Sequence, residues 1–143
     1  MIEQILSNLQ LDKDGIYSYD FNNSEQKDEI QLRESVSTEQ YENHLEVLSY
    51  HHSIIVMDKE IDLFIENIPI NGIILDVGGC WGWHWRRIKD TRPDITVFVL
   101  DFVRKNLLHA KEILGDYVNN NIFLVHGDAT SLKFEENTFD GWW

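Results

Sequence analysis

Hydrophobic residues change their spacing about halfway along the chain. Before residue 72 they recur at three- and four-residue steps, the spacing of one helix face. Thr38 has the character of a helix N-cap, and the apolar positions that follow it favour a helix over 41–55. A second helix is predicted over 58–67, ended by Pro69 and Gly72. A short helix over 2–10 and a loop over 11–35 complete the first half.

From residue 73 short apolar runs alternate with helical segments. The runs at 73–77, 95–100 and 122–125 are almost wholly hydrophobic, as expected for strands buried on both faces, and a fourth strand begins near Thr138. Helices are predicted over 83–91 and over 104–114, the second stopped by Gly115. The pattern predicts an α/β fold with a parallel sheet. The chain divides into an N-terminal helical segment, 1–71, and a Rossmann-like half-domain, 72–143.

Composition and charge narrow the function. The 143 residues carry a formal net charge of −13, and residues 1–71 hold 15 acidic against 4 basic side chains. This acidity repels phosphate backbones, so a nucleic acid substrate is not expected. The apolar runs are too short to span a bilayer, and the N-terminus lacks the charge pattern of a signal peptide. The expected location is therefore the cytoplasm, without a membrane partner.

Polar and glycine residues follow three successive predicted strands. Gly78, Gly79 and Gly82 come after the first strand, Asp101 ends the second, and Asp128 follows the third. Ligands of open parallel sheets bind at the carboxyl ends of the strands. Asp101 lies 19 residues beyond Gly82, a spacing that suits an acceptor for ribose hydroxyls, and Asp128 is placed to accept from an adenine amine. Together these residues predict a site for an adenosine-containing cofactor.

The glycine turn distinguishes between cofactors. A dinucleotide fingerprint needs glycine where this chain has Cys80 and Trp83, and an indole at the second of these positions prevents close packing of helix on strand. Asp76 beside the turn suits a cationic sulfonium and repels a pyrophosphate. These residues favour S-adenosyl-L-methionine over a dinucleotide, although a nucleotide-fold protein that uses the turn otherwise stays an alternative.

The run from Ile74 to Gly82 (ILDVGGCWG) resembles the first motif of class I S-adenosylmethionine-dependent methyltransferases. The segment His126-Gly127-Asp128-Ala129, with Phe139-Asp140 after it, is similar to the corresponding segment of the small-molecule, "type 11" branch. The resemblance covers residues 73–143. It implies the strand order 3-2-1-4, S-adenosyl-L-methionine as cofactor and a small-molecule methyl acceptor. It also implies that the N-terminal segment, residues 1–71, forms a lid or cap over the active site. The implied cofactor site comprises Asp76, Gly78, Gly79, Cys80, Gly82, Asp101, Phe102, Asp128 and Ala129.

Other conspicuous residues have simpler interpretations. Trp81, Trp83 and Trp85 suit helix–sheet packing better than a pocket wall, and Arg86 with Arg87 suits a solvated helix face better than an anion clamp. The histidines match no metal-ligand spacing, so no metal is expected; His51 and His52 as a substrate-side base are a less favoured alternative to packing. Direct methyl transfer needs no covalent enzyme intermediate, so Cys80 is not expected to act as a nucleophile. No catalytic residue is assigned.

The family builds seven strands, and residues 73–143 account for four of them. The fourth strand would then be an unprotected edge that carries Trp142 and Trp143. We therefore expect a truncated chain that is weak or inactive by itself and prone to pair edge to edge as a dimer. The alternative to a methyltransferase is a non-catalytic, truncated or degenerate module that binds the cofactor or a partner without turnover.

Overall fold

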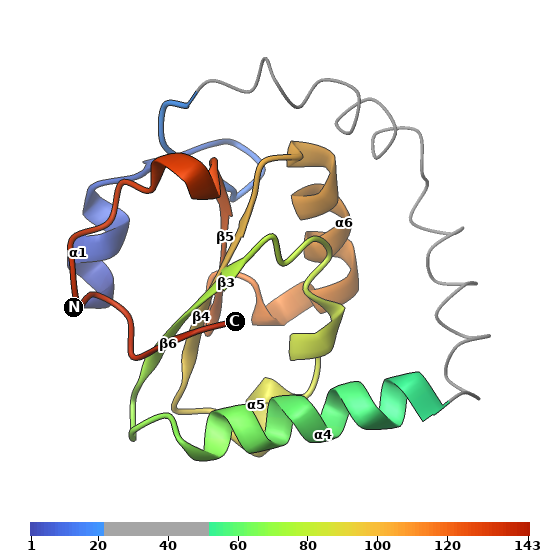
Figure 1. The fold of residues 1–143 in the computed structure, drawn as a ribbon. Coiled ribbons are helices and arrows are strands. Elements are labelled where there is room, and N and C mark those ends of the chain that lie inside the picture. The colour runs from blue at the N-terminus through green and yellow to red at the C-terminus, as the bar shows by residue number, and fades with distance from the viewer. Residues whose placement is uncertain (22–51) are drawn as a thin grey trace.

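A six-stranded sheet forms the centre of the molecule (Figure 1). The structure is a computed structural model, and it describes residues 1–21 and 52–143. The strands of the second half are all parallel: β3 (Ile73–Val77), β4 (Thr96–Asp101), β5 (Ile122–His126) and β6 (Gly141–Trp142). Within the sheet they lie in the order β5-β4-β3-β6. The predicted α/β fold and its 3-2-1-4 order are confirmed.

Alternate side chains of the strands face two separate hydrophobic clusters, one on each side of the sheet. Ile74, Val97 and Val99 belong to the cluster on the side of α4 and α6, whereas Leu75 and Phe98 belong to the opposite one. All six residues of β4 are buried, because this strand lies inside the sheet with both faces covered. This double burial explains why the strands appear in the sequence as continuous apolar runs.

Helices cover both faces of the sheet. On one side lie α4 (His52–Glu66), the short α5 (Ile88–Thr91) and α6 (Arg104–Leu114), and α1 (Ile2–Ser7) lies on the other (Figure 1). α6 ends at Gly115, as predicted, and this glycine has a positive φ of 54°. Among the described residues, no helix combines the length and the apolar character required to cross a bilayer.

The N-terminal residues add a hairpin to the sheet that the sequence analysis missed. The strands β1 (Gln10–Leu11) and β2 (Tyr17–Ser18) pair antiparallel, and β2 runs parallel to the end of β5. The helix predicted over 2–10 therefore ends too late, since α1 stops at Ser7, and the loop predicted from residue 11 is wrong at Leu11 and in β2. Strands of two residues are too short for a periodic pattern, and an Asp12 side chain that accepts from the Asp14 and Ile16 amides makes their turn.

Two predicted helices differ from the structure. The single helix expected over 83–91 is wrong: a 3₁₀ helix, η2 (Trp83–Trp85), and α5 replace it, with Arg86 and Arg87 between them. The amides of Trp85 and Arg86 bond three residues back, which breaks the α-helical pattern. Most of the helix predicted over 41–55 lies outside the described residues. Its last positions belong to α4, which begins before the predicted residue 58.

Candidate cofactor site

The turn after β3 requires a left-handed backbone at three positions. Gly78, Cys80 and Gly82 have φ angles of 71°, 54° and 61°. Glycine adopts this conformation without strain, whereas a side chain at such a position costs about 1–2 kcal/mol. Gly79 is needed for a different reason, since a Cβ there would overlap the Asp76 carboxylate. Cys80 is thus a strained residue in a turn otherwise built from glycines.

Asp101 connects this turn to the next strand and helix. Its Oδ2 accepts the Cys80 amide at 2.9 Å, and its Oδ1 accepts the Val103 amide at 2.8 Å and Asn106 Nδ2 at 3.2 Å. The residue is 5% exposed. Hydrogen bonds from several donors stabilise a buried carboxylate. The acid predicted to bind a ribose therefore also organises the glycine turn and the start of α6.

Asp76 has its own set of partners on the helical side of the turn. Its Oδ2 accepts Trp85 Nε1 and pairs with His84 Nε2, both at 2.6 Å, and the carboxylate is nearly inaccessible. Trp85 is fully buried in the core. In the structure Asp76 thus joins the strand end to η2. The prediction that it serves the cationic sulfonium of the cofactor stays a prediction.

A cleft of about 140 Å³ opens where β3, β4 and β5 end. Its lining brings together five of the predicted site residues with backbone and apolar neighbours: Val77, Gly78, Leu100, Asp101, Phe102, Gly127, Asp128, Ala129 and Thr130. Among the described residues, the lining contains two carboxylates and no basic side chain. A Cβ added to Gly78 would meet nothing within 4 Å, so this backbone faces open space. Asp76, Gly79, Cys80 and Gly82 support the turn without lining the cleft.

Asp128 forms the far wall of the cleft. Its Oδ1 accepts both the amide and the hydroxyl of Thr130, each at 2.8 Å, and this turn starts the 3₁₀ helix η4 (Ala129–Ser131). The backbone of the same residue is also held, because its carbonyl accepts the Tyr19 hydroxyl at 2.7 Å. Burial raises the pKa of Tyr19 to about 12, and the nearby Asp128 charge adds to this rise. Tyr19 stays protonated at neutral pH and donates this bond.

Sequence reasoning did not identify Tyr19, and no local signal would have done so. It lies in a stretch predicted to be loop, 109 residues before its hydrogen-bond partner. A Cβ on Gly127 would overlap the Tyr19 ring, so the glycine before Asp128 permits this contact. A glycine followed by an acid at a strand end indicates a close approach, but it does not reveal which segment approaches.

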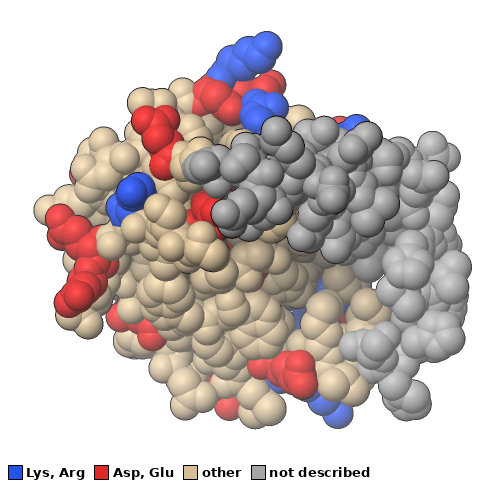
Figure 2. All heavy atoms as spheres, turned by 45° about the horizontal axis from the view of Figure 1, so that its top comes forward, with Lys and Arg blue, Asp and Glu red and all other residues tan. Residues whose placement is uncertain are grey.

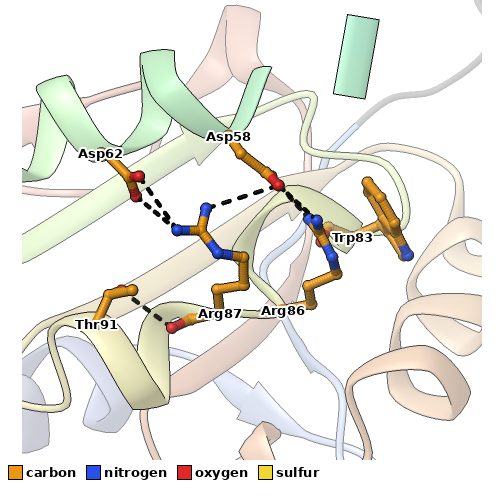
Figure 3. A network of polar contacts seen from close by, with 6 residues as sticks. All are labelled: Asp58, Asp62, Trp83, Arg86, Arg87 and Thr91. Carbon is orange, nitrogen blue, oxygen red and sulfur yellow. Dashed lines mark hydrogen bonds and ion pairs between the residues drawn. The ribbon is translucent and has the colours of Figure 1, made fainter. Parts of the chain in front are cut away.

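The two arginines after η2 hold α4 in place (Figure 3). Arg86 binds Asp58 through both of its terminal nitrogens, at 3.0 and 2.7 Å, and its guanidinium lies 3.6 Å from the Trp83 ring centroid. Arg87 reaches Asp62 at 3.1 Å. The predicted solvated helix face is therefore wrong for both arginines. The ion pairs form because α4, distant in sequence, packs over this segment.

The tryptophans and histidines have structural contacts in this region. Trp81 donates to Asn106 Oδ1 at 3.1 Å and is buried, which agrees with the predicted packing role, as does the burial of Trp85. His51 lies outside the described residues, and of His52 only its place in α4 is described. Within the described ranges no group of three or more potential ligands is arranged to hold a metal ion.

Comparison with known proteins agrees with this geometry. Residues 74–143 match the family model of the methyltransferase domain. No curated protein sequence matches the chain. The fold is similar to that of a "putative s-adenosyl-l-methionine-dependent methyltransferase" from Methanococcus maripaludis, with a TM-score of 0.53, 22% identity and coverage of 74% of this chain. It is also similar to the [4+2]-cyclase SpnF, with a TM-score of 0.53, 22% identity and coverage of 60% of this chain.

The match defines what residues 74–143 are. They match the model of the methyltransferase domain, and this match confirms the resemblance to class I S-adenosylmethionine-dependent methyltransferases drawn from the sequence. The aligned part spans 48% of the Methanococcus protein and 32% of SpnF. The likeness to these two structures concerns the fold, because the same fold supports different reactions.

Proposed function

We propose that the cleft at the ends of β3, β4 and β5 binds S-adenosyl-L-methionine and that the protein transfers its methyl group to a small molecule. The supporting observation is the convergence of the glycine turn, Asp101 and Asp128 on one cleft within a matched methyltransferase domain. The cofactor, when bound, supplies a methyl group on a positively charged sulfur. The division at residue 72, the N-terminal segment as a lid and a cytoplasmic location remain predictions.

The charge of the cleft supports an adenosine-containing cation. In the part of the chain that the structure describes, two carboxylates and no Lys or Arg line it, which favours a sulfonium and disfavours a pyrophosphate. On the face drawn in Figure 2, Asp and Glu side chains are spread over the described surface with fewer Lys and Arg among them. This acidity repels polyanions such as nucleic acid, so a small methyl acceptor is the better match.

Each cleft residue has a separate part in the proposed binding. Gly78 presents its backbone to the open space of the cleft, and Asp101 at the end of β4 accepts hydrogen bonds from ribose hydroxyls. Asp128 and Ala129 at the end of β5 contact the adenine, with Phe102 beside them. The fixed partners of both carboxylates hold them in place before the ligand arrives, and such preorganisation lowers the cost of binding.

Isothermal titration calorimetry with S-adenosylhomocysteine tests this proposal. The 143-residue chain should bind this ligand and should not bind NAD. Asp101→Ala removes a charged acceptor worth about 1.5–3 kcal/mol per hydrogen bond, so its dissociation constant should rise about tenfold or more. Asp116→Ala is the matched control, because this acid is exposed on the 3₁₀ helix η3 (Gly115–Tyr117) and lies outside the cleft.

Several results would contradict the proposal. Tight binding of NAD would assign the cleft to a dinucleotide, and equal affinities of the Asp101 and Asp116 variants would remove Asp101 from the site. Circular dichroism must show that the Asp101 variant is folded, since this residue also holds the glycine turn. If the ligand binds but no methyl group is ever transferred, the alternative of a cofactor-binding module without turnover is favoured.

A further inference from the structure

Residues 17–21, which we call the N-terminal strap, lie against the wall of the cleft formed by Gly127 and Asp128. The strap begins with β2, which pairs with the last residues of β5, so it follows that strand to its carboxyl end. Beyond β2, Tyr19 is 8% exposed and its hydroxyl donates to the Asp128 carbonyl at 2.7 Å. The space for its ring exists because residue 127 is glycine.

The strap also contacts the last residue of β5. The Phe21 ring meets the His126 ring edge to face, with centroids 4.8 Å apart. His126 Nε2 in turn lies 3.1 Å from the Phe102 carbonyl, and because a carbonyl can only accept, the imidazole donates this bond. Burial lowers the pKa of His126, which keeps the ring neutral near pH 7. Asp128 therefore contacts the strap directly, whereas Phe102 is connected to it through His126.

Asp128 is restrained at two points as a result. Thr130 donates to its carboxylate, and its carbonyl accepts both the Tyr19 hydroxyl and, at 3.0 Å, the Ser131 amide. The Thr130 contacts are local and would form in any turn of this type. Two long-range contacts position this turn. The Gly127 amide donates to the Asp101 carbonyl at 3.1 Å, and the Tyr19 hydroxyl adds a restraint from the strap on Asp128 itself.

We propose that the N-terminal strap is part of the cofactor site and that Tyr19 is its positioning residue, which holds Asp128 for the adenine. This inference rests on the proposed function, since it concerns the same cleft. It couples ligand binding to the contact between the strap and the cleft wall. A ligand that contacts Phe102 and Asp128 stabilises this contact, and the contact increases the affinity for the ligand to the same degree.

The test compares Tyr19→Phe with Tyr17→Phe. Tyr19→Phe keeps the ring that packs on Gly127 and removes the hydroxyl that binds Asp128. Tyr17 is half-buried on the same strap, its ring packs against Phe123, and among the described residues its hydroxyl has no hydrogen-bond partner. In calorimetry with S-adenosylhomocysteine, Tyr19→Phe should raise the dissociation constant about threefold to tenfold, the worth of one neutral hydrogen bond. Tyr17→Phe should leave it unchanged.

Hydrogen–deuterium exchange supplies a readout that a merely structural role would not change. S-adenosylhomocysteine should slow exchange of the amides of residues 16–21 in the unmodified chain and slow it less in Tyr19→Phe. Equal affinity and equal protection in the two variants would overturn the inference and leave the proposed function standing. Lower thermal stability of Tyr19→Phe with unchanged affinity would likewise overturn it. If the unmodified chain binds no S-adenosylhomocysteine, the proposed function fails, and the inference fails with it.

Discussion

Cys80 offers a sharp test of how the glycine turn is built. Its φ of 54° lies in the left-handed region, where a Cβ costs about 1–2 kcal/mol. Glycine relieves this strain, but its greater conformational freedom in the unfolded chain costs about 0.4–1 kcal/mol of stability and so offsets part of the gain. Comparing Cys80→Gly with Cys80→Ala removes the thiol from both variants, so the difference between them reports the backbone alone. We expect the glycine variant to be more stable by about 1 kcal/mol.

Urea unfolding followed by tryptophan fluorescence measures this difference, since the chain has five tryptophans and the turn lies among three of them. Glu112 provides the matched control, because it is exposed inside α6, where helix propensity governs. There the order should be reversed, with Glu112→Ala more stable than Glu112→Gly by about 1 kcal/mol. An alanine variant at position 80 as stable as the glycine variant would refute the assignment of left-handed strain to this turn.

Four further predictions concern the ion pair to α4, the Gly127–Tyr19 contact, the pKa of Tyr19 and the edge strand β6. Arg86→Lys loses the paired bonds to Asp58 and the stacking on Trp83, and should lower the free energy of unfolding by about 0.5–1 kcal/mol in urea titrations; an unchanged value would contradict the role of this ion pair. Gly127→Ala should lower the melting temperature, because its Cβ overlaps the Tyr19 ring, and Tyr19→Ala in the same chain should restore part of the loss. The pKa of Tyr19 is about 12 in the folded chain against an ordinary 10.0. The stability that this difference contributes is fully present below pH 10 and is lost as the pH rises toward 12. The free energy of unfolding should therefore fall less steeply over this interval in Tyr19→Phe. Trp142 is 55% exposed on the edge strand β6, so the isolated chain should self-associate in size-exclusion chromatography and Trp142→Lys should reduce this; a concentration-independent monomer would contradict the predicted edge pairing.

The sequence determined the parallel sheet and the position of the cleft. The strands are buried on both faces, so their apolar runs were visible, and the turn residues follow directly on them. Because the carboxyl ends of parallel strands meet at one edge of a sheet, Gly78, Asp101 and Asp128 had to converge once the strand order was right. This part of the site depends on backbone geometry and on short stretches of chain.

Only the tertiary structure decided which side chains contact one another around the glycine turn, the cleft and α4. Tyr19 meets Asp128, and Arg86 meets Asp58, through contacts between segments far apart in sequence, and neither contact leaves a periodic pattern. Asp76 was predicted to serve a ligand, yet its oxygen already accepts from Trp85 and pairs with His84, a choice set by how η2 packs on the sheet. A residue type specifies what a side chain can bond to, whereas the packing of distant elements specifies which partner is within reach.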